Sequence, residues 1–183
     1  FVNEYDNIMQ EVLDENSNLY SFNPNIIFLF TNLNRVAPKL EPVILSKNVD
    51  DINNVLLEAS DYYERIIASI RKQSESNIVI CNQALDPYPI CGISDIQNPF
   101  GYINSVKSIN DKLSLKSNLN KDVNILDINL LISRIGYNNF FDKRNYHLSK
   151  NPFSTNGLRY LAFECVKYLS SLKSLSKKCI VLD

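Results

Sequence analysis

The sequence predicts an α/β fold, a three-layer α/β/α sandwich around a mainly parallel, doubly wound sheet. Short, continuous apolar runs alternate along the chain with longer segments whose apolar residues recur every three or four positions. The short runs lack the in-and-out alternation of a strand with one exposed face, which is typical of parallel strands covered by helices on both faces. With 183 residues, 45% of them hydrophobic, the chain can bury the core of one such domain.

Four apolar runs have the length and composition of buried strands. They comprise residues 26–30, 78–81, 123–126 and 179–182. In folds of this class, ligands bind outside the carboxyl ends of the parallel strands. The residues that follow or end these runs are Thr31-Asn32, Asn82-Gln83, Asp127 and Asp183.

Amphipathic helices are predicted around these strands, because apolar residues recur there at helical spacing. The predicted helices cover residues 3–14, 52–70, 102–115 and 155–172. Asn48 and Asp50 can cap the second helix, and Ser154 or Thr155 the fourth.

The connecting stretches are rich in proline or polar residues. Residues 35–48, 82–100 and 137–152 are predicted to form loops. Residues 127–135 permit either an extension of the third strand or a short helix, and Gly136 is a natural stop.

Charge and hydropathy exclude two classes of partner. A net charge of −1 gives no electrostatic case for nucleic acid. The longest apolar run, at 26–30, is far shorter than the roughly 20 residues of a membrane-spanning helix. No signal peptide is visible, although the chain begins at Phe1 rather than Met, which leaves room for an upstream portion.

The cysteines indicate a reducing compartment. They lie far apart in the sequence, form no C-x-x-C pair, and are accompanied by a single His, so they do not make up a zinc set. Reduced thiols and a cytoplasmic location are therefore expected. The four are Cys81, Cys91, Cys165 and Cys179.

His147 is the one histidine and hence the main candidate for acid–base chemistry near neutral pH. Asp142 precedes it closely enough to orient an imidazole ring, as in a Ser-His-Asp arrangement. The simpler interpretation is an exposed loop in which His147 is solvated and Asp142 caps a turn. The residues alone leave both interpretations open.

Two strand ends offer further candidates. An amide at Asn32 or Asn34 could donate a hydrogen bond to an oxyanion, although Asn is also a common turn residue; Asn82 has the same ambiguity. Asp183 ends an apolar run, which is where a metal-binding nucleophile would lie in a parallel sheet.

The order of these features resembles the SGNH hydrolase family. An apolar strand at 25–32 ends in Asn32, and Asp142 and His147 come shortly before the last helix. The resemblance implies an oxyanion role for Asn32 and an Asp-His pair. The Gly-Asp-Ser block that carries the nucleophile of that family does not occur in this sequence.

Several blocks look more specifically like FkbH-like proteins, which carry an SGNH-like domain followed by a haloacid-dehalogenase-type phosphatase domain. They are Tyr5-Asp6, Ser17-Asn18-Leu19-Tyr20, Phe22-x-Pro24, Asp142-x-Arg144-x-Tyr146, Lys150-x-Pro152-Phe153-Ser154 and the stretch from Lys177 to Asp183. By this resemblance, residues 1–176 would form the SGNH-like domain without its first strand or strands. Residues 177–183 would form the first strand of the phosphatase domain.

The resemblance also implies a reaction. FkbH-like proteins load a glyceryl unit from a phosphoglycerate donor onto an acyl carrier protein, with Mg²⁺ in the phosphatase domain. Asp183 would be the first Mg²⁺ ligand and begin the phosphatase motif. We expect no cofactor in the 183 residues alone and no complete reaction from them.

Two other functions stay open at this point. The chain could be an SGNH-type esterase or acyltransferase that uses Asp142 and His147, or a non-catalytic module that docks a carrier protein.

Overall fold

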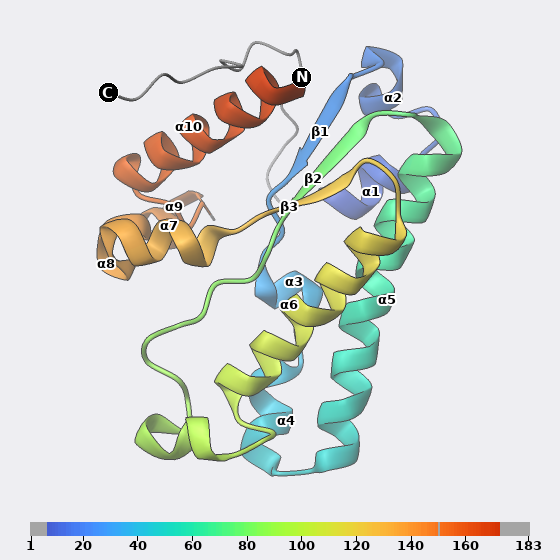
Figure 1. Cartoon of the computed structure of the whole chain (residues 1–183). Helices are drawn as coiled ribbons and strands as arrows, with labels where there is room; N and C mark the ends of the chain where they lie inside the picture. Colours follow the sequence, from blue (N-terminus) through green and yellow to red (C-terminus); the bar gives the residue numbers. More distant parts are fainter. Residues whose placement is uncertain (1–6, 150, 173–183) are drawn as a thin grey trace, which may run out of the picture. The chain divides into compact units, whose positions relative to one another are not determined.

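The computed structural model describes residues 7–149 and 151–172, which divide into two compact units, one up to Asn129 and one from Leu130. The first unit contains a parallel sheet of three strands, β1 (Ile26–Leu29), β2 (Asn77–Cys81) and β3 (Val123–Leu126), in the order β1-β2-β3 (Figure 1). Ile78 in the central strand pairs with Ile27 on one side and Val123 on the other. The predicted α/β class and parallel sheet are confirmed.

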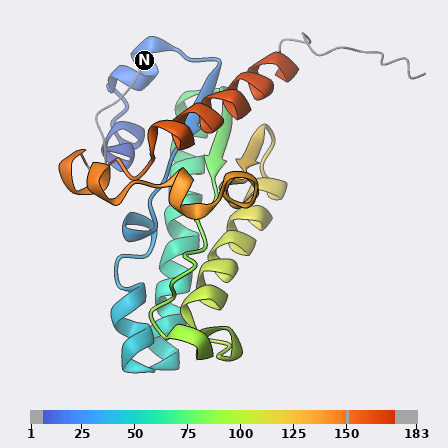
Figure 2. The same ribbon diagram turned by 90° about the vertical axis from the view of Figure 1, so that its left-hand side faces the viewer.

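Two long helices connect the strands. α5 (Val49–Gln73) runs between β1 and β2, α6 (Tyr102–Leu119) runs between β2 and β3, and the two lie side by side (Figures 1 and 2). Because both crossovers advance in the same direction, right-handed connections place both helices on one face of the sheet. The reversal of strand order that defines a doubly wound sheet does not occur among the three described strands.

The core lies between the central strand and these helices. Ile78 to Cys81 are buried, and the apolar stripe predicted for α5 is buried along its full length. β1 differs from the prediction, because Ile27 and Leu29 are buried whereas Ile26 and Phe28 on its other face are half-exposed. Burial on both faces therefore holds for β2 but not for β1.

Four short helices belong to the amino-terminal half. The helix predicted at 3–14 is seen as α1 (Ile8–Leu13), its first residues lying outside the described part, and α2 (Asn18–Phe22) follows. The loop predicted at 35–48 is wrong, since it contains parts of α3 (Leu33–Val36) and all of α4 (Leu40–Ser46). Pro42 is compatible with α4 because it lies in the first turn, where backbone N–H groups have no partner within the helix.

The stretch after β2 is irregular, as predicted, except for the 3-10 helix η1 (Gly92–Gln97). Its anchor is Asp95, a fully buried carboxylate that accepts hydrogen bonds from the backbone N–H groups of Tyr102 (2.9 Å) and Ile103 (2.8 Å). These are first-turn donors of α6, so Asp95 both caps that helix and holds the preceding loop against it.

The second unit is helical. Within residues 127–135 the chain forms a helix, α7 (Ile128–Ile135), and not an extension of the third strand. The loop predicted at 137–152 is wrong, because α8 (Tyr137–Phe140) and α9 (Lys143–Ser149) occupy most of it. The predicted last helix is confirmed as α10 (Thr155–Leu172).

Aromatic packing explains why 137–152 does not form an open loop. Phe140 is fully buried, and its ring contacts Phe141 and Phe153 edge-on. Phe141 and Phe153 stack with their ring centroids 5.8 Å apart and form an antiparallel bridge. Gly157 of α10 lies so close to α8 that a Cβ atom there would come within 2.2 Å of the Phe140 carbonyl oxygen.

The cap of α10 is confirmed, but part of its predicted core face is not. Ser154 Oγ accepts a hydrogen bond from the N–H of Gly157 (2.9 Å), which makes Ser154 the cap. Leu161 is buried, whereas Leu158 and Val166 from the predicted apolar stripe are exposed.

Three remaining sequence features concern thiols, membranes and the carboxyl terminus. Among the described residues, Cys81, Cys91 and Cys165 are not in disulfide bonds, and the reducing compartment stays a prediction. Within the described ranges no helix is long and apolar enough to span a bilayer. Cys179, the strand predicted at 179–182 and the domain boundary predicted after residue 176 lie outside the described residues.

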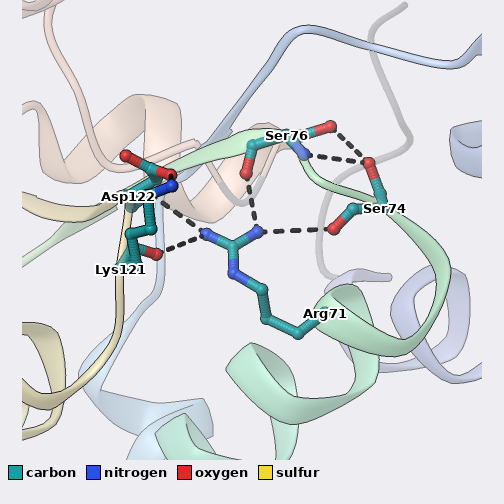
Figure 3. A network of polar contacts seen from close by, with 5 residues as sticks. All are labelled: Arg71, Ser74, Ser76, Lys121 and Asp122. Carbon is teal, nitrogen blue, oxygen red and sulfur yellow. Dashed lines mark hydrogen bonds and ion pairs between the residues drawn. The ribbon is translucent and has the colours of Figure 1, made fainter.

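Arg71 ties together the segments that enter β2 and β3 at the amino edge of the sheet (Figure 3). Its Nη1 donates to the carbonyl oxygens of Ser76 (2.7 Å) and Ser74 (3.4 Å), and its Nη2 donates to those of Lys121 (3.0 Å) and Asp122 (3.2 Å). The planar guanidinium reaches four carbonyls at once, which a single ammonium group cannot do. Ser76 Oγ extends the link to β1 by donating to the Pro24 carbonyl.

Replacing Arg71 with Lys should lower the free energy of unfolding by about 1 to 3 kcal/mol, since carbonyls that Arg71 satisfies lose a donor. Urea denaturation measures this change. The matched control is Arg65→Lys, an exposed position on the same helix, where we expect a change within about 0.5 kcal/mol. Equal unfolding midpoints for the two variants would show that the Arg71 links contribute nothing.

Candidate functional site

The carboxyl edge of the sheet holds a connected set of amide and hydroxyl groups. All three strands are parallel, so the residues that follow them meet at this edge. Thr31 lies just after β1, Asn82 and Gln83 follow β2, and Asp127 follows β3. This is the edge at which the sequence predicts a site.

Gln83 is the centre of the set. It is 2% exposed, and its Nε2 donates to Thr31 Oγ1 (2.8 Å) and to the Tyr63 hydroxyl (2.8 Å). Thr31 Oγ1 in turn lies 3.4 Å from the Cys81 carbonyl oxygen, to which it donates. One buried amide thus connects the end of β1, the end of β2 and the middle of α5.

The backbone of Gln83 is held by two asparagine side chains. Its N–H donates to Asn110 Oδ1 (2.7 Å), and its carbonyl oxygen accepts from Asn110 Nδ2 and from Asn129 Nδ2, both at 2.9 Å. Asn129 Oδ1 also accepts from the N–H of Leu85 (2.9 Å). The chain leaving β2 is therefore fixed to α6 and to the start of α7.

Asn82 and Asp127 close the edge between β2 and β3. Asn82 Nδ2 donates to Asp127 Oδ1 (2.8 Å), and Asn82 Oδ1 accepts from the N–H of Ile128 (2.9 Å). Asp127 Oδ1 also accepts from the N–H of Asn129 (2.9 Å) at the first turn of α7. Both side chains thus support the start of this helix.

The electrostatics of the edge favour binding over proton transfer. Burial raises the pKa of Tyr63 to about 12, and the weaker opposing effect of its hydrogen bonds with Thr31 and Gln83 does not reverse this. Tyr63 therefore stays protonated at neutral pH, and amides do not titrate there. Tyr63 and the amide groups can hydrogen-bond a polar ligand or order the backbone, but none of them exchanges a proton near pH 7.

Asn32 and Asn34 lie at the same edge, as predicted. Asn32 Oδ1 accepts from the N–H of Asn34 (2.9 Å) and so caps the short helix α3. An oxyanion role for Asn32 stays a prediction. In the structure its side-chain oxygen, Oδ1, caps α3.

Asp142 and His147 lie in the second unit. Asp142 Oδ1 accepts from the N–H groups of Arg144 (2.8 Å) and Asn145 (3.3 Å) at the start of α9, and His147 is an exposed residue on that helix. The His147 ring centroid lies 6.0 Å from that of Tyr146. In the described part of the chain, no hydrogen bond joins Asp142 to His147, and their catalytic pairing stays a prediction.

The predicted metal ligand Asp183 lies outside the described residues. Within residues 7–149 and 151–172, no group of three or more His, Cys, Asp or Glu side chains is placed to hold a metal ion.

An apolar hollow of about 450 Å³ lies on the loop after β2. It is lined by Pro87, Tyr88, Pro89, Gly92, Ile93, Ile96 and Ile103. No charged side chain lines it, so it offers contact area but no acid, base or metal ligand.

Sequence reasoning identified some members of the carboxyl-edge set and missed others. Asn82 and Asp127 were accessible to it because they directly follow apolar runs. Gln83 was also named as part of a strand end, but its central role was not predicted. Asn110 and Asn129 were missed, since their contacts with Gln83 span 27 to 46 residues of the chain. A usable signal is that Gln83 is polar yet lies between a buried strand and a proline-rich stretch.

Residues 1–169 match the family described as FkbH, N-terminal domain. The chain is also similar to a solved structure, the N-terminal part of protein BF1531 from Bacteroides fragilis, described as containing a phosphatase domain complexed with Mg. The TM-score is 0.81 at 18% identity, and the similarity covers 98% of this chain but 46% of that one. At this identity the likeness shows a shared fold. No curated protein matches the chain.

Removing the Tyr63 hydroxyl should destabilise the first unit. Tyr63→Phe leaves one N–H of the buried Gln83 amide without an acceptor, at a cost of about 1 to 3 kcal/mol in the free energy of unfolding. The control is Tyr88→Phe, because Tyr88 is 68% exposed and should change by no more than about 0.5 kcal/mol. A loss of equal size in both variants would contradict the role given to Gln83.

The same hydroxyl makes stability depend on alkaline pH. Tyr63 ionises near pH 10 when unfolded and at about 12 when folded, so its contribution is complete below pH 10 and is lost as pH rises towards 12. Tyr63→Phe should therefore reduce the fall in stability over this range by up to about 1.4 kcal/mol per pH unit. Denaturant titrations at several alkaline pH values measure the two slopes; parallel slopes would refute the assignment.

Proposed function

Because the chain belongs to the FkbH N-terminal domain family, we propose that it is the front domain of a glyceryl transferase/phosphatase. The whole protein would load a phosphoglycerate-derived glyceryl unit onto an acyl carrier protein. The observation that carries this proposal is the family match over residues 1–169. The similarity in fold to a protein whose solved part contains a phosphatase domain supports it.

In this proposal the front domain positions the carrier and the phosphatase domain does the phosphate chemistry. The carboxyl-edge groups support this division, since Gln83, Asn110 and Asn129 hydrogen-bond to protein partners and Tyr63 stays protonated. Mg²⁺ would lie in the phosphatase domain with Asp183 as its first ligand. The described residues do not supply the rest of such a ligand set, so we assign it to the phosphatase domain.

We also propose that the complete domain has the three-layer, doubly wound SGNH-like arrangement. β1 is an edge of the described sheet, and its outer side pairs with no described strand. An unpaired strand edge tends to recruit another strand. Two strands that precede β1 in the chain, added there with the earlier one next to β1, would create the reversal of strand order.

A non-catalytic carrier-docking module is the second candidate. It is favoured by the absence of a Gly-Asp-Ser block from the sequence and by the capping role of Asp142. An esterase that uses Asp142 and His147 has less support, because Asp142 hydrogen-bonds to the backbone of α9. Equal rates of nitrophenyl ester hydrolysis by the protein and by His147→Ala would exclude an esterase that uses His147.

Mass spectrometry of the carrier tests the main proposal. A protein extended beyond Asp183 through the phosphatase domain should convert the carrier thiol to a glyceryl thioester when given Mg²⁺ and a phosphoglycerate activated as an acyl phosphate. The thiol displaces the acyl phosphate, and the phosphatase domain hydrolyses the remaining phosphate ester. The 183-residue chain should not, and Asp183→Asn in the extended protein should abolish loading. If the extended protein loads no carrier with any phosphoglycerate donor, the transferase function is refuted.

The extended protein also separates carrier docking by the front domain from a catalytic role of His147. If the front domain only docks the carrier, His147→Ala should leave the saturated loading rate unchanged. A loss of at least about 100-fold in that rate, the size of a general acid–base contribution, would instead place His147 in the chemistry.

A further inference from the structure

The last described helix, α10, exposes apolar and basic side chains along one side. Residues 158, 159, 162, 163 and 166 are spaced so that they follow one another along the helix surface. Leu158, Phe163 and Val166 are 44%, 51% and 57% exposed, and Arg159 and Ala162 are exposed as well. We call these five residues the α10 stripe.

Two side chains of the α10 stripe contact each other. The guanidinium carbon of Arg159 lies 5.5 Å from the centroid of the Phe163 ring, within the range of a cation–π contact. Arg and Phe are enriched in protein interfaces, and their stacking reduces the side-chain entropy lost when a partner binds. The stripe therefore has the composition of a recognition surface.

The charge of the second unit favours an acidic partner. The described residues of the second unit contain five Lys or Arg against two carboxylates, Asp142 and Glu164. Glu164 is paired with Arg134 (3.1 Å) and Lys167 (2.7 Å), and Asp142 caps α9. Within the described chain, Lys143, Arg144 and Arg159 have no carboxylate partner. This surplus of positive charge complements an acidic surface.

We propose that the α10 stripe is the docking surface for the acidic, amphipathic helix of the carrier protein. This inference rests on the proposed function and deepens it by naming where the carrier binds. The apolar side chains of the stripe would pack against the apolar side of the partner helix. Arg159 would meet carboxylates at the edge of that helix.

Calorimetry with a recombinant acyl carrier protein that bears its phosphopantetheine arm tests this inference on the 183-residue chain. Arg159→Glu and Phe163→Ala should each raise Kd by at least about tenfold, as for central interface residues. Rising salt should weaken binding by the parent chain, and by Arg159→Glu to a smaller extent. Circular dichroism checks that both variants remain folded.

Matched controls lie on α6 in the first unit. Lys107→Glu repeats the charge reversal at another exposed position, and Leu119→Ala repeats the apolar truncation at a residue that is 82% exposed. Both should leave Kd within about twofold, as expected for residues away from an interface.

The outcomes distinguish this inference from the function on which it rests. If the carrier binds and the stripe variants bind as tightly as the parent, the docking site is wrong while the carrier remains a partner. If the carrier does not bind at all, both this inference and carrier docking by the front domain are overturned. If the stripe variants instead abolish self-association measured by light scattering, the stripe serves a second copy of the chain and the inference is overturned.

Discussion

A parallel sheet of three strands, none longer than five residues, has too few hydrogen bonds of its own to fix the chain segments at its ends. Those segments contain backbone groups that must be satisfied once they are buried. In this protein, side chains from the crossover helices supply the missing partners at both edges of the sheet. Arg71 does so at the amino edge, and Asn110 does so at the carboxyl edge. The sheet and its helices therefore depend on each other through a few long-range polar contacts.

This dependence shapes what the carboxyl edge can do. In many parallel α/β proteins that edge is left open to a ligand. Here Gln83, Asn82 and Asn129 use their amide groups to hold the strand ends and the start of α7. The second unit, in contrast, has basic and apolar side chains that face solvent on α10. The two units thus differ. The polar side chains at the carboxyl edge of the first unit order the backbone, whereas α10 of the second unit exposes side chains of the kind found in binding surfaces.

The periodicity of the sequence predicted the elements that apolar burial controls. β3 and α10 have the predicted bounds, and the α5 stripe and the Asn48 cap are as expected, because each depends on residues close in sequence. The short helices α4 and α9 were missed. Proline at the start of α4 and the mixture of polar and aromatic residues around α9 obscure the helical pattern, and tertiary packing stabilises both segments.

The candidate site was predictable in location but not in composition. The edge follows from the parallel strands, whereas the central role of Gln83 depends on Tyr63 and Thr31, which are 20 and 52 residues away in the sequence. No local pattern encodes such pairs. Asp142 is the opposite case. Its hydrogen bonds go to residues two and three positions later, so the sequence alone allowed its capping role to be predicted.

The bridge between Phe141 and Phe153 closes the base of the segment that contains α9. Ser154 N–H also bonds to the Phe140 carbonyl oxygen, so both ends of this segment are pinned beside α8. Once a base is closed in this way, the entropic cost of a longer connection grows only slowly with its length. Residues could therefore be inserted or deleted around α9 during evolution without changing the position at which α10 begins.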